Sequence, residues 1–291
     1  MSALTVPSKQ CPICKSRAHF KFKLRGFNLY QCLTCLHQFF SPHPSKIRKI
    51  YEKEKYYRDS QKFPSFSKQD HRNFPQCKTF TSRLSEIRSL LDLKQPKILD
   101  VGCGAGLFVK ICNQQKIKAT GIDFSKTAIR LAKKLKSNCY HQDFLKDMAD
   151  SCFDVITMFD VLEHLVNPSA FLKKAHSALK KKGVLILTTP KGDSFACKIF
   201  KKRWHLYTPP LHLQIFSSLS VRLLLEKQGF KVLKIKNQGQ WTNLGYMVSK
   251  MISIYNLKTA FIEKLLHQAN LHRLNLYCNL FDVITIFAQK E

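Results

Sequence analysis

The sequence predicts an α/β protein: a doubly wound, mostly parallel seven-stranded sheet with a small cysteine-rich module in front of it. Three observations support this fold class. Strand-like apolar runs alternate with helical patterns from Lys97 onward, a glycine-rich turn follows the first of these strands, and two Cys-x-x-Cys pairs lie within residues 1–45. A β-α-β-α order is typical of parallel sheets that carry helices on both faces.

The elements follow from this alternation. We expect residues 1–45 to form the module, 46–95 a helical linker and a lead-in helix, and 96–291 the main domain, with a mostly helical insert near 241–270. The expected strands are 97–101, 118–122, 139–142, 153–158, 183–189, 230–236 and 281–288. The expected helices are 46–59, 77–93, 107–115, 125–136, 169–179 and 218–228, with a loop at 60–75.

Length and composition are those of an ordinary globular protein. The 291 residues are 44% hydrophobic and 23% charged, which suits one large domain and a small appendage. No run approaches the roughly 20 apolar residues of a membrane-spanning helix. The first ten residues lack the apolar core of a secretory signal. We therefore expect a cytoplasmic protein without a transmembrane segment.

The formal net charge of +30 raises the question of a nucleic-acid partner. Lysine outnumbers arginine, however, and nucleic-acid recognition favours arginine. The lysines are also spread along the chain, with only short clusters such as 180–182 and 201–203. RNA remains possible as a partner, and an anionic substrate or a membrane surface would explain the charge equally well.

The two Cys-x-x-Cys pairs predict a structural zinc site in a zinc ribbon. Seventeen residues separate the pairs, a spacing typical of tetrahedral four-thiolate zinc sites. The module is too small for much of a core, so metal binding would supply its folding energy. The predicted ligands are Cys11, Cys14, Cys32 and Cys35. The alternative is a set of redox-active or unligated thiols, and we expect His19 and His37 to be surface or supporting groups.

The segment Ile98–Phe108 predicts a ligand-binding turn. Glycines at 102, 104 and 106 let the backbone approach a ligand closely. Leu107 stands where a dinucleotide-binding fingerprint needs its last glycine, which counts against NAD. Acidic residues accompany three successive strands, at Asp100, Asp123 and Asp143. Because ligands bind at the carboxyl ends of parallel strands, we expect these acids at one site, with Asp123 accepting from both hydroxyls of a ribose.

Together these features resemble a class I S-adenosylmethionine (SAM)-dependent methyltransferase with a Rossmann-like fold, over about residues 96–240. The zinc knuckles and the tyrosine-rich segment after them resemble the amino-terminal module of a subset of bacterial methyltransferases. The resemblance implies that the glycine turn holds the methionine and ribose parts of SAM, and that acids hold its ammonium, ribose and adenine groups. The implied cofactor residues are Asp100, Gly102, Gly104, Gly106, Asp123, Phe124, Asp143, Phe144 and Asp160.

Methyl transfer to a hydroxyl group also needs a base, and two histidines are candidates. His164 lies in a segment, Asp160–Leu165, that resembles quinone-biosynthesis O-methyltransferases, in which the acids and the histidine hold a divalent ion or the substrate. His212 lies in the irregular region after the fifth strand. The alternative for His164 is a packing role. In the same region Trp204, His205 and Tyr207 either line an aromatic pocket or pack a lid.

The leading hypothesis is an enzyme that transfers a methyl group from SAM to an oxygen atom of a small-molecule, sugar or quinone-like acceptor. One alternative is an RNA methyltransferase that holds RNA with the basic surface and the zinc ribbon. Against this alternative, the sequence has no Asn/Asp-Pro-Pro-Tyr element after the fourth expected strand. Another alternative is a non-catalytic binding protein with the SAM fold, against which the intact glycine turn and the three acids argue.

Overall fold

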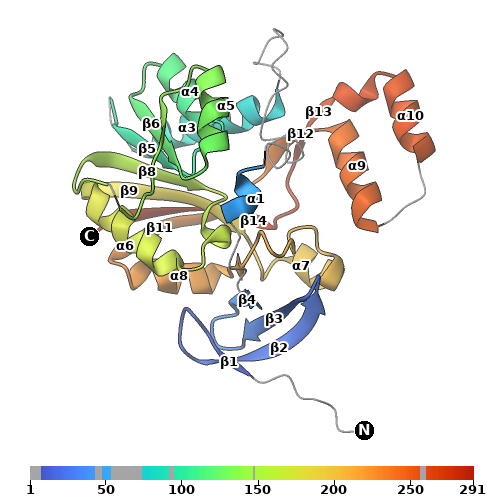
Figure 1. Cartoon of the computed structure of the whole chain (residues 1–291), viewed down its shortest axis with the longest axis horizontal. Coiled ribbons are helices and arrows are strands. Elements are labelled where there is room, and N and C mark those ends of the chain that lie inside the picture. Colours follow the sequence, from blue (N-terminus) through green and yellow to red (C-terminus); the bar gives the residue numbers. More distant parts are fainter. Residues whose placement is uncertain (1–7, 43–47, 54–73, 92–94, 147, 256–259) are drawn as a thin grey trace.

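A computed structural model describes residues 8–42, 48–53, 74–91, 95–146, 148–255 and 260–291. Its main body is a seven-stranded sheet between two layers of helices, with a smaller sheet beneath it (Figure 1). The predicted loop at 60–75 and most of the predicted helix at 46–59 lie outside the described residues. Within that helix the structure describes α1 (Arg48–Tyr51).

The seven-stranded sheet confirms the predicted fold class. Its seven strands make six neighbouring pairs, of which four are parallel and the two that involve β14 (Val283–Lys290) are antiparallel. In spatial order the strands are β11 (Phe230–Asn237), β14 (Val283–Lys290), β9 (Leu179–Pro190), β8 (Phe153–Phe159), β5 (Ile98–Val101), β6 (Ala119–Asp123) and β7 (Cys139–His141). Strand order therefore reverses beside β5, where open α/β sheets bind ligands.

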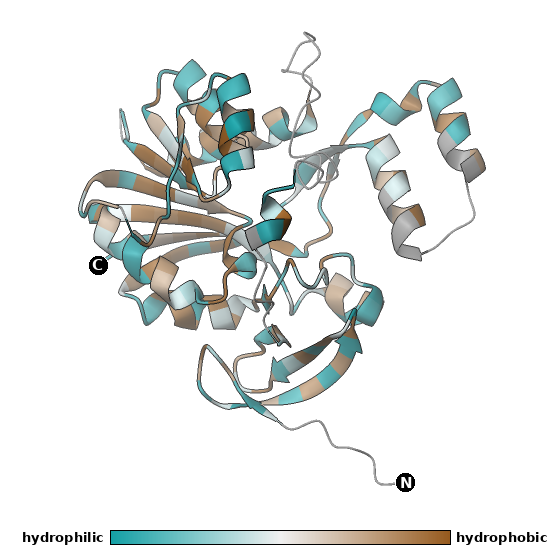
Figure 2. Cartoon of the chain, viewed as in Figure 1, coloured by the Kyte–Doolittle hydropathy of each residue, from teal (hydrophilic) through white to brown (hydrophobic). Residues whose placement is uncertain are grey.

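Helices cover both faces of this sheet (Figure 1). Their apolar sides form two separate cores with the strands, one on each face, and Figure 2 shows the hydrophobic strands enclosed between them. On one face lie α3 (Pro75–Leu90), α4 (Leu107–Gln114) and α5 (Lys126–Lys134), and on the other α6 (Pro168–Ala178) and α8 (Ser218–Glu226). These helices and strands begin or end within a few residues of the predicted bounds.

The cysteine-rich module forms an antiparallel sheet that takes in a strand from the main domain. Its order is β1 (Lys9–Gln10), β2 (Arg17–Leu24), β3 (Phe27–Cys32), β4 (Gln38–Ser41) and β10 (Gln214–Ile215). The pairing of β4 with β10 joins residues about 175 positions apart and was not expected from the sequence. Helix α7 (Phe195–Phe200) lies beside this junction (Figure 1).

The insert differs in part from the prediction. Trp241 lies in a strand, β12 (Gln240–Asn243), and not in a helix. This strand pairs with β13 (Asn275–Cys278), and the two form a ladder at the base of the insert. Between them α9 (Leu244–Tyr255) and α10 (Ala260–Gln268) project to one side (Figure 1). Among the described helices, none combines the length and the apolar character needed to cross a membrane.

Candidate functional site

The glycine turn bends sharply after β5, as the sequence predicts. Gly102, Gly104 and Gly106 have φ angles of 71°, 53° and 75°, the left-handed region that other residues rarely adopt. A Cβ atom at Gly102 would lie 2.7 Å from Val161, and one at Gly106 would lie 2.6 Å from the Cys139 sulfur. The turn therefore tolerates no side chain at these two positions, and it brings bare backbone to the carboxyl end of β5.

Asp123, at the end of β6, fixes this turn. Its carboxylate accepts hydrogen bonds from the backbone N–H of Gly104, at 3.0 Å, and of Ser125, at 2.8 Å. The side chain of Ser125 then accepts from the Ala128 N–H and caps α5. Carboxylate, glycine turn and helix start thus form one rigid unit beside the cavity.

A cavity of about 350 Å³ lies at the carboxyl ends of β5, β6 and β8. This volume is within the range of small-molecule and cofactor sites. Seven of the nine predicted cofactor residues line it: Gly102, Gly104, Asp123, Phe124, Asp143, Phe144 and Asp160. A larger hollow of about 910 Å³ between α3 and α4 is an open groove that contains none of the nine. The smaller cavity is therefore the candidate cofactor site.

The other two predicted cofactor residues support the site from behind. Gly106 begins α4 and does not line the cavity. Asp100 is 4% exposed and accepts a hydrogen bond of 2.7 Å from the Thr157 hydroxyl. Burial raises the pKa of the Asp100 carboxyl to about 7. Asp100 is thus a buried carboxyl group beneath the turn and does not border the cavity directly.

Arg83 is a residue of this region that the sequence does not predict. It lies on α3, is 7% exposed, and packs its guanidinium over the Phe159 ring at 4.7 Å. Burial lowers the pKa of Arg83, while the charges of Asp160 and Asp100 raise it. Its Nε atom has no hydrogen-bond partner among the described residues. The sequence gives little signal for this role, because a single arginine on an amphipathic helix is usually exposed.

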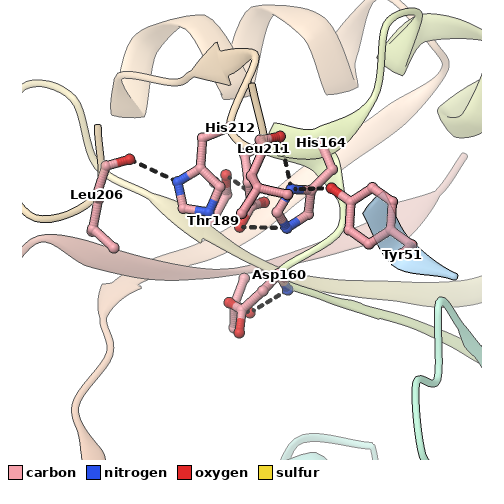
Figure 3. A network of polar contacts seen from close by, with 9 residues as sticks. Tyr51, Asp160, His164, Thr189, Leu206, Leu211 and His212 are labelled. Carbon is pink, nitrogen blue, oxygen red and sulfur yellow. Dashed lines mark hydrogen bonds and ion pairs between the residues drawn. The ribbon is translucent and has the colours of Figure 1, made fainter. Parts of the chain in front are cut away.

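His164 lines the cavity, and two further groups that could bind a proton or a cation, Glu163 and His212, meet it from outside the cavity lining (Figure 3). Ligand atoms of Glu163, His164 and His212 lie within 4.8 Å of one another. Glu163 is 1% exposed and accepts a hydrogen bond from the Thr189 hydroxyl at 3.2 Å. The two imidazole rings contact edge to face, with centroids 4.9 Å apart. The structure thus brings the two predicted candidate bases together, and it adds Glu163.

The Nδ1 atom of each histidine lies within hydrogen-bonding distance of a backbone carbonyl (Figure 3). His212 Nδ1 lies 2.7 Å from the Leu206 carbonyl, and His164 Nδ1 lies 3.0 Å from the Leu211 carbonyl. Because a carbonyl oxygen can only accept, Nδ1 is the protonated nitrogen in each neutral ring. Nε2 is then the basic nitrogen, the arrangement by which proteins orient histidines that accept protons or bind metals.

Tyr51 on α1 spans the two sides of the cavity. Its hydroxyl lies 2.9 Å from His164 Nδ1, and its ring contacts Phe124 edge to face at 5.6 Å. Its backbone carbonyl accepts a hydrogen bond of 2.8 Å from the Ser125 hydroxyl. The sequence predicts only that Tyr51 lies in a linker helix, because no local pattern shows which side of the domain that helix contacts.

The aromatic residues after β9 do not border the cavity. Trp204 is 1% exposed, and its indole N–H donates to the Asp282 carboxylate at 3.0 Å. Tyr207 contacts Trp204 edge to face and packs on Phe22 and Phe40 of the cysteine-rich module. Of the two alternatives for these residues, packing is the one that the structure supports.

The four predicted zinc ligands also converge. The sulfur atoms of Cys11 and Cys35 lie 3.6 Å apart, those of Cys14 and Cys32 lie 3.4 Å apart, and all four lie within 4.8 Å of one another. These separations suit four thiolates around one tetrahedral ion. His19 is exposed, whereas His37 is fully buried beside the cluster.

Comparison with known proteins agrees with this geometry. A family model described as a methyltransferase domain matches residues 69–235. "Ubiquinone biosynthesis O-methyltransferase" of Idiomarina loihiensis is 31% identical over 101 residues, 32% of this chain and 42% of that protein. The protein of the same name from Glaesserella parasuis is 36% identical over 105 residues, 32% of this chain and 44% of that protein. The chain thus matches less than half the length of each of these relatives.

Solved structures share the fold. Magnesium protoporphyrin IX methyltransferase from Synechocystis PCC 6803, with bound SAH, superposes with a TM-score of 0.56 at 15% identity, over 85% of this chain and all of that one. A SAM-dependent methyltransferase from Archaeoglobus fulgidus gives a TM-score of 0.51 at 20% identity, over 74% of this chain and 94% of that one. The family model covers more than half of the sequence, and the fold agrees with it. The chain therefore belongs to the methyltransferase-domain family and is built as a SAM-dependent methyltransferase.

Proposed function

We propose that this chain transfers a methyl group from SAM to a hydroxyl oxygen of a small, quinone-like acceptor. The observation that carries the proposal is the convergence of Glu163, His164 and His212 beside the cavity that holds the predicted cofactor residues. The names of the relatives, ubiquinone biosynthesis O-methyltransferases, favour an aromatic hydroxyl as the acceptor group.

The cavity suits SAM in one orientation. Asp123 would accept from the ribose hydroxyls, with Phe124 against the adenine ring and Asp143 near its amino group. The buried cation of Arg83 beside Asp160 suits the carboxylate of the methionine part, and the negative charge of Asp100 favours its ammonium group. This orientation directs the sulfonium methyl toward His164.

The reaction is an in-line displacement at carbon. The acceptor oxygen forms a bond to the methyl carbon as the carbon–sulfur bond breaks, and the sulfonium becomes the neutral thioether of S-adenosylhomocysteine (SAH). Nε2 of His164 or His212 takes the hydroxyl proton, and the buried Glu163 carboxylate stabilises the imidazolium that forms. Two imidazole nitrogens and a carboxylate also fit the divalent ion implied by the resemblance, which would lower the pKa of the acceptor hydroxyl.

The four cysteines of the module would hold one Zn²⁺ ion as thiolates. Such a closed site has no open position for a substrate, so the ion would be structural. Three of the four cysteines, Cys11, Cys32 and Cys35, are fully buried, so the ion would be shielded from solvent.

Methyl transfer to an extract of cell metabolites, with tritiated SAM as donor, tests the function. We expect label in small phenolic compounds. Of the variants His164→Ala and His212→Ala, the one that removes the base should lower the rate about 100-fold or more, the usual contribution of a general base. Both variants should bind SAH normally, and His19→Ala, at an exposed position, is the matched control. Label confined to a ribonuclease-sensitive fraction would instead identify an RNA methyltransferase.

A further inference from the structure

We propose that the cysteine-rich module is a structural part of the acceptor site, so that its metal ion controls the positions of His212 and His164 but not cofactor binding. The inference rests on the proposed function for the identity of the acceptor site. It assigns the module a positioning role, which a merely appended zinc ribbon would not have.

The first link is the strand that the two sheets share. The Phe40 N–H donates to the Leu213 carbonyl at 2.9 Å, and the Leu213 N–H donates to the Glu163 carbonyl at 2.8 Å. One residue, Leu213, therefore connects β4 of the module to the backbone of Glu163. Leu213 directly follows His212, so the same contact fixes the backbone that carries this histidine.

The second link starts at the metal-binding turn. Two residues after Cys35, the imidazole of fully buried His37 forms a hydrogen bond of 2.8 Å with the Gln214 side chain. The amide of Gln214 donates in turn to the Leu165 carbonyl, next to His164, at 3.4 Å. The Cys35 carbonyl itself accepts a hydrogen bond of 2.6 Å from the Ser217 hydroxyl.

The third link holds His212 from the opposite side. Its Nδ1 atom is oriented by the Leu206 carbonyl, which lies between Trp204 and Tyr207 in the sequence. Both aromatic residues are buried in a core that includes Phe22 and Phe40 of the module. The Tyr207 hydroxyl also donates to Gln38 of β4, and the Gln38 amide donates to the Gly192 carbonyl at 3.0 Å.

The cofactor side is held differently. The hydrogen bonds from module residues 8–42 to the rest of the described chain all go to residues 192–217. The glycine turn and Asp123 instead depend on contacts within β5, β6 and the start of α5. Loss of the metal should therefore loosen the acceptor side and leave the cofactor side in place.

The two tryptophans provide a direct readout. Trp204 is buried at the junction, whereas Trp241 lies in the insert, so a Trp241→Phe background makes Trp204 the sole reporter. In this background we compare the zinc-loaded protein, the protein after removal of zinc by a chelator, and Cys35→Ser, with Cys152→Ser outside the module as the control. We expect zinc loss and Cys35→Ser to shift Trp204 emission to longer wavelength, and the SAH dissociation constant to stay within about threefold.

A second variant separates positioning from folding. His37→Phe keeps an aromatic ring between Phe39 and Phe216 but removes the bond to Gln214. We expect it to retain one zinc per chain and normal SAH affinity, to shift the ¹³Cε1 resonances of His164 and His212, and to slow methyl transfer about 10- to 100-fold, as small misplacements of reacting groups do.

The outcomes are distinct. Unchanged Trp204 emission and unchanged histidine resonances after zinc loss would overturn the proposal. So would loss of SAH binding together with zinc, because the module would then hold the whole fold. Failure of the proposed function would give a different result. His164→Ala and His212→Ala would then transfer methyl groups at the wild-type rate, regardless of any shift in Trp204 emission.

Discussion

At the scale of single residues, Asp123 holds the glycine turn, and we propose that it also binds the ribose. Its two oxygens accept from the backbone at Gly104 and Ser125, and the same carboxylate borders the cavity where a ribose would lie. In this proposal, one short acidic side chain at the end of β6 shapes the turn and accepts from the ligand. Most of its effect should be seen in binding, because the turn also has backbone bonds to Ile122.

We predict that Asp123→Ala weakens SAH binding by about 10- to 100-fold, because hydrogen bonds to a charged group contribute about 1.5–3 kcal/mol. Isothermal titration calorimetry measures the change, and circular dichroism should show the native spectrum. Asp150→Ala removes an exposed carboxylate that does not line the cavity and serves as the control. Unchanged affinity in Asp123→Ala would show that the ribose lies elsewhere.

Asp100 predicts a pH dependence of cofactor affinity. Burial raises the pKa of this carboxyl to about 7, so its ionised fraction rises from about 10% at pH 6 to about 90% at pH 8. The ionised form attracts the ammonium group of SAH, whereas in the free protein ionisation of this buried carboxyl costs stability as pH rises. SAH affinity should therefore increase up to about ninefold between pH 6 and pH 8. Calorimetry on Asp100→Asn should give a flatter profile, and an equal slope in both proteins would exclude Asp100 as the cause.

At the scale of elements, the start of α5 joins the cofactor side to the linker. The Ser125 hydroxyl accepts from the Ala128 N–H, at 3.2 Å, and donates to the Tyr51 carbonyl. The Glu52 carboxylate lies 3.3 Å from the N–H groups of Lys126 and Thr127, where a helix N-terminus favours negative charge. Helix α5 is thus capped by Ser125 from its own sequence and by Glu52, which directly follows α1.

We predict that Ser125→Ala lowers the free energy of unfolding by about 1–2 kcal/mol, since it removes a helix cap and a buried hydrogen bond. Chemical denaturation monitored by circular dichroism measures the loss. Ser82→Ala, at an exposed position within α3, should change stability by less than about 0.5 kcal/mol. Equal stability of the two variants would mean that α5 does not depend on this cap.

The elements also show what the sequence can predict. The strands, the helices and the glycine turn follow from local patterns, and the acids at strand ends meet because parallel strands share one edge. The pairing of β4 with β10, the burial of Arg83 and the contact of Tyr51 with His164 depend on packing between distant segments. The sequence predicts Trp241 in a helical insert. It does not predict the strand β12, because β12 is short and its partner β13 lies more than 30 residues further along the chain.

At the scale of the whole molecule, the chain passes twice through the junction of its two larger sheets. It leaves the module after β4, builds most of the large sheet, and returns after β9 to add β10 to the module before α8 begins. The candidate acceptor residues lie where it returns. Module and catalytic sheet therefore share backbone hydrogen bonds and a common core, and neither can be removed without exposing buried residues of the other.

This arrangement predicts that the zinc-loaded chain unfolds as one cooperative unit. In the Trp241→Phe background, thermal unfolding followed by Trp204 emission and by far-ultraviolet circular dichroism should give coincident transitions, the standard test for two-state behaviour. Saturating SAH, at about 100 times its dissociation constant, should raise both midpoints together, because it stabilises the native state by about 2.7 kcal/mol. Asp123→Ala should show a smaller rise at the same SAH concentration. A Trp204 transition that precedes the loss of helix, and that SAH does not move, would instead mean that the module melts independently of the catalytic sheet.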